Sequence, residues 1–122
     1  MTFRPAHIAL LVASTGATPA LAEYGAVAVN ANTSNFGFSR GFKSKASARE
    51  QAMAFCHEYS KGKAGCEVVL TTSKCAAVAR AGRSLAIGES RRTAAANTEA
   101  MTACSASHGN SCKIVADFCA SQ

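Results

Sequence analysis

The sequence contains no apolar run long enough to cross a membrane. A helical span of a bilayer takes about 20 apolar residues. The longest candidate lies near the start of the chain, where the apolar residues 8–13 are followed by polar or helix-breaking residues at Ser14, Thr15, Gly16 and Pro19. This segment is too short and too broken to be a membrane span, and no other segment approaches that length.

Groups suited to acid–base catalysis are also scarce. The chain has seven acidic residues, of which Asp117 is the only aspartate, and beyond the N-terminal segment its histidines are His57 and His108, each in a polar stretch near a cysteine. Nucleophilic catalysis needs a nucleophile, an oriented base and an oxyanion site, and no such set stands out. Gly62 and Gly65 lack the strand-to-helix context of a phosphate-binding loop. We therefore expect no enzymatic activity and no cofactor.

The first 22 residues have the features of a cleaved signal peptide. Arg4 gives a positive start, a short apolar run follows, and residues 20–22 read Ala-Leu-Ala, the small-x-small pattern of a cleavage site. A frayed strand or helix is the alternative, and Pro5 and Pro19 argue against it. Position 23 is Glu and not Cys, so nothing indicates a lipoprotein anchor. The mature chain should begin at Glu23 and be exported, to the periplasm or out of the cell.

Six cysteines lie in this predicted mature chain: Cys56, Cys66, Cys75, Cys104, Cys112 and Cys119. An even number of cysteines in a short exported chain is typical of a disulfide framework, because the compartment beyond the inner membrane is oxidising. Zinc is the rival interpretation for the spacing Cys104-x₃-His108-x₃-Cys112. The first half of the chain has no matching histidine, so we expect disulfides and no metal site.

Residues 23–122 have the length of a single domain and contain an internal repeat. The aligned segments are 26–28 with 77–79, 48–56 with 96–104, and 66–69 with 112–115. The alignment also places Gly37 over Gly88 and Cys75 over Cys119. We infer a duplication, with copies over about 24–75 and 76–119.

Each copy is expected to form a β-β-α-β unit. Short apolar or alternating runs separated by turn formers predict a hairpin, and a helix follows with alanines and a cysteine on one face. Ser44 or Ser47 can cap the first helix, and Thr93 the second. The expected strands are 24–29, 36–39 and 67–72 in the first copy, and 76–80, 84–88 and 113–118 in the second. The predicted class is α+β: two tandem repeats with pseudo-twofold symmetry, forming an antiparallel sheet with two helices packed on it.

Four features together resemble a known family. They are the strand YGAVA at 24–28, the aromatic-Gly-aromatic run at 36–38, the alanine-rich helix that ends in Cys56, and the run CEVV at 66–69. In these the chain is similar to the bacterial family called domain of unknown function 4189 (DUF4189), over residues 24–119. The resemblance implies a small secreted or periplasmic protein and supplies no catalytic residues. The chain departs from the family pattern in lacking tryptophan, which such strands often carry.

Six cysteines allow 15 pairings. Each copy holds three, so full pairing requires at least one bridge between copies. Cys75 and Cys119 each end their copy, and equivalent positions can meet near a pseudo-twofold axis. The expected set is Cys56–Cys66, Cys104–Cys112 and Cys75–Cys119, each stabilising the fold by roughly 2–4 kcal/mol.

The chain is basic, with thirteen Lys and Arg residues and a formal net charge of +6 at pH 7. In both copies basic residues gather between the second strand and the helix. This sign of charge opposes the helix macrodipole, whereas a helix N-terminus flanked by Arg and Lys suits an anion. The candidate anion-binding residues are Arg40, Lys43, Lys45, Arg49, Arg91 and Arg92. A solvated face without a ligand is the alternative.

These features predict a non-catalytic, exported interaction module with a protein partner. The alternative is a binder of anionic polymers or lipid headgroups through the basic segments. Binding that weakens with salt would favour the alternative, and a salt-insensitive protein partner would favour the first hypothesis.

Overall fold

The computed structural model describes residues 21–121. The predicted signal peptide therefore lies outside the described residues, apart from Leu21 and Ala22. The elements in chain order are β1 (Tyr24–Asn30), β2 (Phe36–Phe42), α1 (Lys45–Tyr59), β3 (Cys66–Thr72), β4 (Cys75–Ala81), β5 (Ser84–Ser90), α2 (Thr93–His108), the 3₁₀ turn η1 (Gly109–Ser111) and β6 (Lys113–Cys119).

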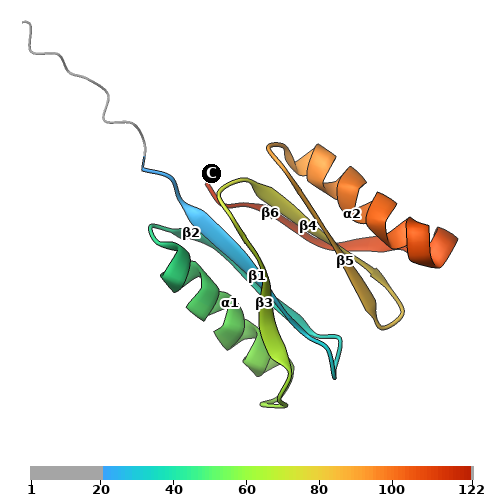
Figure 1. The fold of residues 1–122 in the computed structure, drawn as a ribbon, viewed down its shortest axis with the longest axis horizontal. Helices are drawn as coiled ribbons and strands as arrows, with labels where there is room; N and C mark the ends of the chain where they lie inside the picture. Colours follow the sequence, from blue (N-terminus) through green and yellow to red (C-terminus); the bar gives the residue numbers. More distant parts are fainter. Residues whose placement is uncertain (1–20, 122) are drawn as a thin grey trace, which may run out of the picture.

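The strands form two antiparallel sheets, one from each β-β-α-β unit. Sheet A has the order β2-β1-β3, and sheet B has the order β5-β4-β6. The two sheets lie face to face in the middle of the molecule, with α1 on the outer face of sheet A and α2 on the outer face of sheet B (Figure 1). The predicted α+β class, with two repeated units and two packed helices, is confirmed. The strands divide between two sheets, whereas the sequence pattern predicted a single sheet.

The central strands β1 and β4 are buried on both faces, and their two faces carry side chains of different size. Toward the helices they present alanines, such as Ala26 and Ala28 in β1, which pack against buried alanines of α1. Toward the other sheet they present Val27 and Val78, which are fully buried. Each valine stabilises the fold by roughly 1.5–3 kcal/mol through burial, so the bulky core lies between the sheets.

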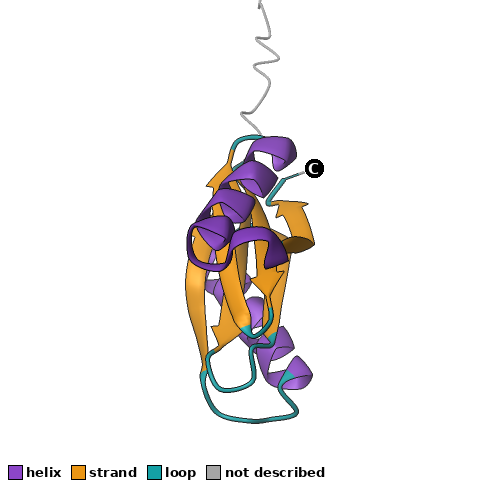
Figure 2. Ribbon diagram, turned by 90° about the vertical axis from the view of Figure 1, so that its right-hand side faces the viewer, coloured by secondary structure: helices purple, strands orange, loops and turns teal. Residues whose placement is uncertain are grey.

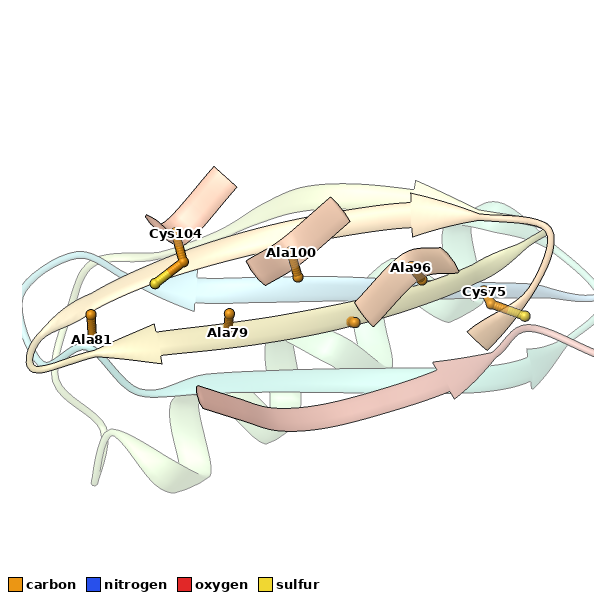
Figure 3. Packing of buried hydrophobic residues seen from close by; sticks show 7 residues of the cluster. Cys75, Ala79, Ala81, Ala96, Ala100 and Cys104 are labelled. Carbon is orange, nitrogen blue, oxygen red and sulfur yellow. The ribbon is translucent and has the colours of Figure 1, made fainter. Parts of the chain in front are cut away.

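The helices lie close to their sheets because both surfaces are lined with small side chains. In the second unit the methyl groups of Ala96 and Ala100 lie over the strand that carries Ala79 and Ala81 (Figure 3). The other half of the molecule repeats this packing with Ala48 and Ala52. Turned by 90°, the molecule shows the strands packed between the helices (Figure 2).

Two glycines allow the helix backbone to approach a strand directly. A Cβ at Gly37 would clash with the backbone of Ala52 and Cys56, and a Cβ at Gly88 would clash with Ala96 and Ala100. The sequence alignment of Gly37 with Gly88 was wrong by two residues, which is one period of a strand. Gly37 pairs with Ala28, and Gly88 pairs with Ala77. Because Ala77 corresponds to Ala26 rather than to Ala28, the glycines lie under successive turns of their helices.

The helix starts differ between the units. Ser44 is the N-cap of α1, and its hydroxyl accepts a hydrogen bond from the Ser47 backbone N–H at 3.1 Å. The N-cap of α2 is Arg92, which provides no side-chain cap. The expectation that Thr93 caps α2 was wrong: Thr93 is the first helical residue, and its Oγ1 lies 3.1 Å from the Sγ of Cys119.

The disulfides pair as expected, Cys56–Cys66, Cys75–Cys119 and Cys104–Cys112. The inference that one of them joins the two units was wrong. Cys75 is the first residue of β4 and lies opposite Cys119 of β6 within sheet B. The first unit therefore holds two cysteines and the second holds four, so each unit closes its own bridges.

Hydrogen bonds from the second unit to a turn of the first hold the units together at one end. Asn30 is fully buried, and its Oδ1 accepts from the backbone N–H groups of Asn32 and Thr33. The guanidinium of Arg80 donates to the Ser34 carbonyl at 2.9 Å, and that of Arg83 donates to the Asn32 carbonyl at 3.0 Å. Arg80 reaches this β1–β2 turn from β4, and Arg83 reaches it from the turn between β4 and β5.

Each outer strand β3 and β6 carries a register shift at the same place in its unit. The β1–β3 pairing skips Val69, and the β4–β6 pairing skips Val115. Both side chains are exposed, 46% for Val69 and 36% for Val115. They occupy matched positions of the repeat, so this irregularity is a feature of the unit itself.

Candidate functional site

The strand register places three chain junctions at one end of the molecule. In sheet A this end holds the start of β1 and the ends of β2 and β3, and in sheet B it holds the start of β4 and the ends of β5 and β6. The turn at residues 73–74 joins the sheets there, and the Gly41 N–H donates to the Ala120 carbonyl at 2.9 Å. The β2–α1 junction, the β3–β4 turn and the β5–α2 junction therefore share one end, where both helices begin (Figure 1).

Five exposed cations stand on these three junctions. We call them the basic end: Lys43, Lys45, Lys74, Arg91 and Arg92. Residues 43–45, 73–74 and 91–92 contain no acidic residue. The topology thus brings the basic segments of both units to one end and adds Lys74 to them. Sequence reasoning missed Lys74 because the turn between the units has no counterpart in the repeat.

Two of the candidate residues lie away from the basic end or face another surface. Arg49 lies one turn into α1 and lines a shallow surface with Glu50 and His57 on the β3 side of the helix. Arg40 lies within β2 and lines a groove on the opposite side of α1. Lys45 stays at the basic end with its ammonium group 5.7 Å from the centre of the Tyr24 ring, within the range of a cation–π contact.

The groove between α1 and β2 is the second candidate site. It has a volume of about 520 Å³, and we call it the aromatic groove. Its lining residues are Phe38, Ser39, Arg40, Phe42, Gln51, Phe55 and Tyr59. Four aromatic rings, one guanidinium and one side-chain amide therefore converge on it from two elements.

Neighbouring contacts hold three of these rings in place. Phe38 stacks on Phe118 of sheet B with ring centroids 4.9 Å apart, and Phe55 stacks on Tyr59 at 6.2 Å. Gly37 lets the start of the Phe55 side chain lie directly on β2, because a Cβ at this glycine would come within 2.6 Å of the Phe55 Cβ. Tyr59 remains 58% exposed at the mouth of the groove.

The second unit carries different side chains at the equivalent positions. Strand pairing shows that Ile87 and Glu89 occupy the positions equivalent to Phe38 and Arg40. When the two helices are aligned on their buried residues, the positions of Gln51, Phe55 and Tyr59 are occupied by Glu99, Ala103 and Ser107. The Glu89 backbone N–H donates to the Glu99 carboxylate at 3.0 Å, which confirms that this strand and helix position are neighbours. The aromatic groove is thus specific to the first unit.

Sequence reasoning did not find this groove. Its aromatic residues are spread over positions 38 to 59, and the repeat alignment drew attention to what the units share. The i, i+4 spacing of Phe55 and Tyr59, with no aromatic residue at either matching position of the second helix, was the signal available.

The histidines and cysteines offer no metal site within residues 21–121. No group of three or more His, Cys, Asp or Glu side chains in this range is placed to hold an ion. All six cysteines form disulfides, so Cys104 and Cys112 have no thiolate to donate beside His108. His57 and His108 are both exposed. What the described surface offers is charge at the basic end and aromatic contact in the groove.

In the described part of the chain, neither helix combines the length and apolar character that a membrane crossing needs. Neither a curated protein nor a solved structure shows significant similarity to the chain. A family model described as domain of unknown function (DUF4189) matches residues 24–119, which include every strand and both helices of the described residues. The chain therefore belongs to the DUF4189 family.

Proposed function

We propose that this protein is an exported, non-catalytic binding module that attaches to a polyanion through its basic end. Three disulfides support an oxidising compartment beyond the inner membrane. The family supplies no known catalytic role, and the described surface presents cations and aromatic rings. Binding is the function that these groups serve.

One observation carries the choice of partner. The fold brings cations from both repeats and from the turn between them to one end, on segments that contain no acidic residue; the Glu23 carboxylate lies beside Gly41 at the same end. Arg92 is the N-cap of α2, where a positive charge opposes the helix dipole. An anion at this end would be stabilised both by the side chains and by the exposed N–H groups at the helix starts.

Heparin, as a soluble polyanion, tests this proposal. Binding of the oxidised mature protein should weaken steeply with salt, because each neutralised charge releases counterions. Replacing Lys43, Arg91 and Arg92 by glutamine should lower affinity at least about tenfold and reduce the slope of log affinity against log salt by roughly two to three. Affinity would be measured by titration calorimetry at several salt concentrations.

A control of equal charge comes from the other end of the molecule. Lys61, Lys63 and Lys113 are exposed and lie beside the far ends of the sheets. Their triple replacement by glutamine should leave both affinity and salt slope within about twofold of the unaltered protein. Equal losses in the two variants would place any attraction in net charge and not in this arrangement.

The same series addresses the second candidate function, a protein partner. Its supporting observation is the apolar surface at the junction of the units, where exposed Tyr59 and Val115 lie beside Phe36. A partner bound there would be retained equally at low and high salt and equally by both charge variants. That result, together with no salt-dependent binding to heparin, would overturn the polyanion proposal.

A further inference from the structure

The aromatic groove has no role in the proposed attachment through the basic end. We propose that it binds a small amphipathic anion, a molecule that combines an apolar ring or short chain with one carboxylate. This inference goes beyond the proposed function, because it concerns a separate site with different chemistry.

The size and lining of the groove indicate the apolar part of the ligand. Its volume of about 520 Å³ lies within the roughly 300–1,000 Å³ range of small-molecule sites. Phe38, Phe42, Phe55 and Tyr59 supply aromatic walls from both a strand and a helix. Flat rings and short acyl chains bury the most surface against such walls.

The polar residues of the groove indicate the charged part. Arg40 and Gln51 are its long polar side chains, and no carboxylate lines it. Within the described residues, Arg40 makes no ion pair and is exposed. A guanidinium presents paired N–H donors that match a carboxylate in a bidentate arrangement. One cation beside four rings therefore suits a ligand with a single negative charge.

The second unit shows that the fold does not require this set of residues. It forms the same β-β-α-β unit with Ala103 and Ser107 in place of Phe55 and Tyr59. It also has Glu89 in place of Arg40, which reverses the charge. Aromatic residues and a cation at positions where a duplicate of the same scaffold folds without them point to ligand recognition.

The groove is also ordered before any ligand arrives. Stacking on Phe118 fixes Phe38, and α1 is held against β2 by its contact with Gly37. The Ser39 hydroxyl donates to the Ala48 carbonyl at 2.6 Å, which ties the same strand and helix together. A preformed wall loses little side-chain freedom on binding, so a weak, small ligand can still bind specifically.

Nuclear magnetic resonance titration of the isotope-labelled mature protein tests the site, with 1-naphthoate as probe. Its roughly 13 heavy atoms support a Kd of about 1 mM or tighter in a well-formed site. We expect saturable shifts of amides in residues 38–42 and 51–59. Residues 87–90 and 99–107 of the second unit, equivalent in fold, should stay unshifted and serve as the internal control.

Matched probes and variants separate the charged and apolar contributions. The neutral 1-naphthalenemethanol should bind about tenfold more weakly than 1-naphthoate, and Arg40→Gln should erase most of that difference. Phe55→Ala combined with Tyr59→Ser gives α1 the side chains that α2 already has, so the fold should persist while naphthoate binding is lost. Lys43→Gln, a nearby cation of the basic end, should leave naphthoate binding within about twofold.

The outcomes decide between the two sites. Equal binding of the charged and neutral probes, or an unchanged affinity of Arg40→Gln, overturns the inference. So do shifts of residues 87–90 and 99–107 or the absence of saturable shifts. The Phe55→Ala/Tyr59→Ser variant should keep its heparin affinity, so failure of the groove inference leaves the polyanion proposal standing, and the reverse also holds.

Discussion

Gly37 sets the distance between α1 and its sheet. The helix backbone lies directly on this residue, and a Cβ there would meet the carbonyl of Ala52 at 2.6 Å. The residue at the equivalent strand position of the second unit is Ala86, opposite Ala79. The two helices lie over matched strand positions, because Ser39 contacts Ala48 where the equivalent Gly88 contacts Ala96. The glycine that permits direct backbone contact therefore lies under a different helical turn in each unit.

We predict that Gly37→Ala destabilises the protein by roughly 1–3 kcal/mol, because the added methyl group overpacks a rigid backbone contact. The direction of this change in stability is informative. At an unhindered position the same change stabilises a protein by about 0.4–1 kcal/mol through the unfolded chain. Urea unfolding of the oxidised protein measures the difference. Unchanged or increased stability would contradict the close approach of α1 to β2.

The helix starts show a conflict between stability and charge. Ser44 caps α1, whereas Arg92 occupies the corresponding position of α2 and makes no capping hydrogen bond. The backbone of Arg92 is extended, with φ −124° and ψ 142°, which is the conformation that a capping serine adopts. The position is therefore suited to a cap that the sequence does not provide.

Arg92→Ser should raise the free energy of unfolding by roughly 0.5–1 kcal/mol, because it adds a cap and removes a charge that opposes the dipole. The same variant should bind heparin more weakly. Ser44→Ala is the matched control and should lower stability by a similar amount without changing heparin affinity. Thermal unfolding and calorimetric titration would be run on both variants. A loss of stability in Arg92→Ser would contradict the assigned helix start.

At the level of elements, much of the architecture could be predicted from the sequence. The alanine and cysteine spacing of each helix identified its buried face, and Ala48, Ala52 and Cys56 are indeed buried. The division into two sheets could not be predicted in this way. Whether β3 and β4 pair within one sheet or belong to two sheets depends on the alternation of alanine and valine in the central strands. The periodicity of these strands indicates only that they are fully buried.

The whole molecule consists of two units that share an apolar interface but no covalent link other than the chain itself. Phe118 is buried against Phe38 of the other unit, and the arginines of β4 and the following turn bind the β1–β2 turn. The cysteine count was misleading because Cys75, three residues beyond the end of β3, is the first residue of β4. A shift of the unit boundary by those few residues changes the number of bridges that must cross it from one to none.

Mass spectrometry of the exported, unreduced protein tests both processing and pairing. The intact chain should begin at Glu23, and tryptic digestion in denaturant should give three disulfide species. We expect peptide 50–61 linked to 64–74, peptide 75–80 linked to 114–122, and peptide 93–113 with an internal bridge. A retained Met1 would contradict export by a cleaved signal. A link between a cysteine before residue 75 and one after it would contradict the separate closure of the units.

The candidate sites were predictable to different degrees for a physical reason. Charge is visible in a sequence as a local cluster, so most of the basic end was identified from Lys43, Lys45, Arg91 and Arg92. Their convergence depends on strand register, which a local cluster of charges does not reveal. The aromatic groove joins residues of β2 and α1 that only the packing of the helix brings together, and it differs between units that the repeat makes look alike.

The register shifts at Val69 and Val115 limit how molecules of this protein can associate with one another. A regular outer strand offers a straight row of unpaired backbone groups on which a further chain can add, the first step toward fibrous aggregates. A bulge interrupts that row and twists the strand away from a flat approach. Because β3 and β6 each carry one, one edge of each sheet is protected against templated growth, so high local concentrations need not lead to polymerisation along these edges.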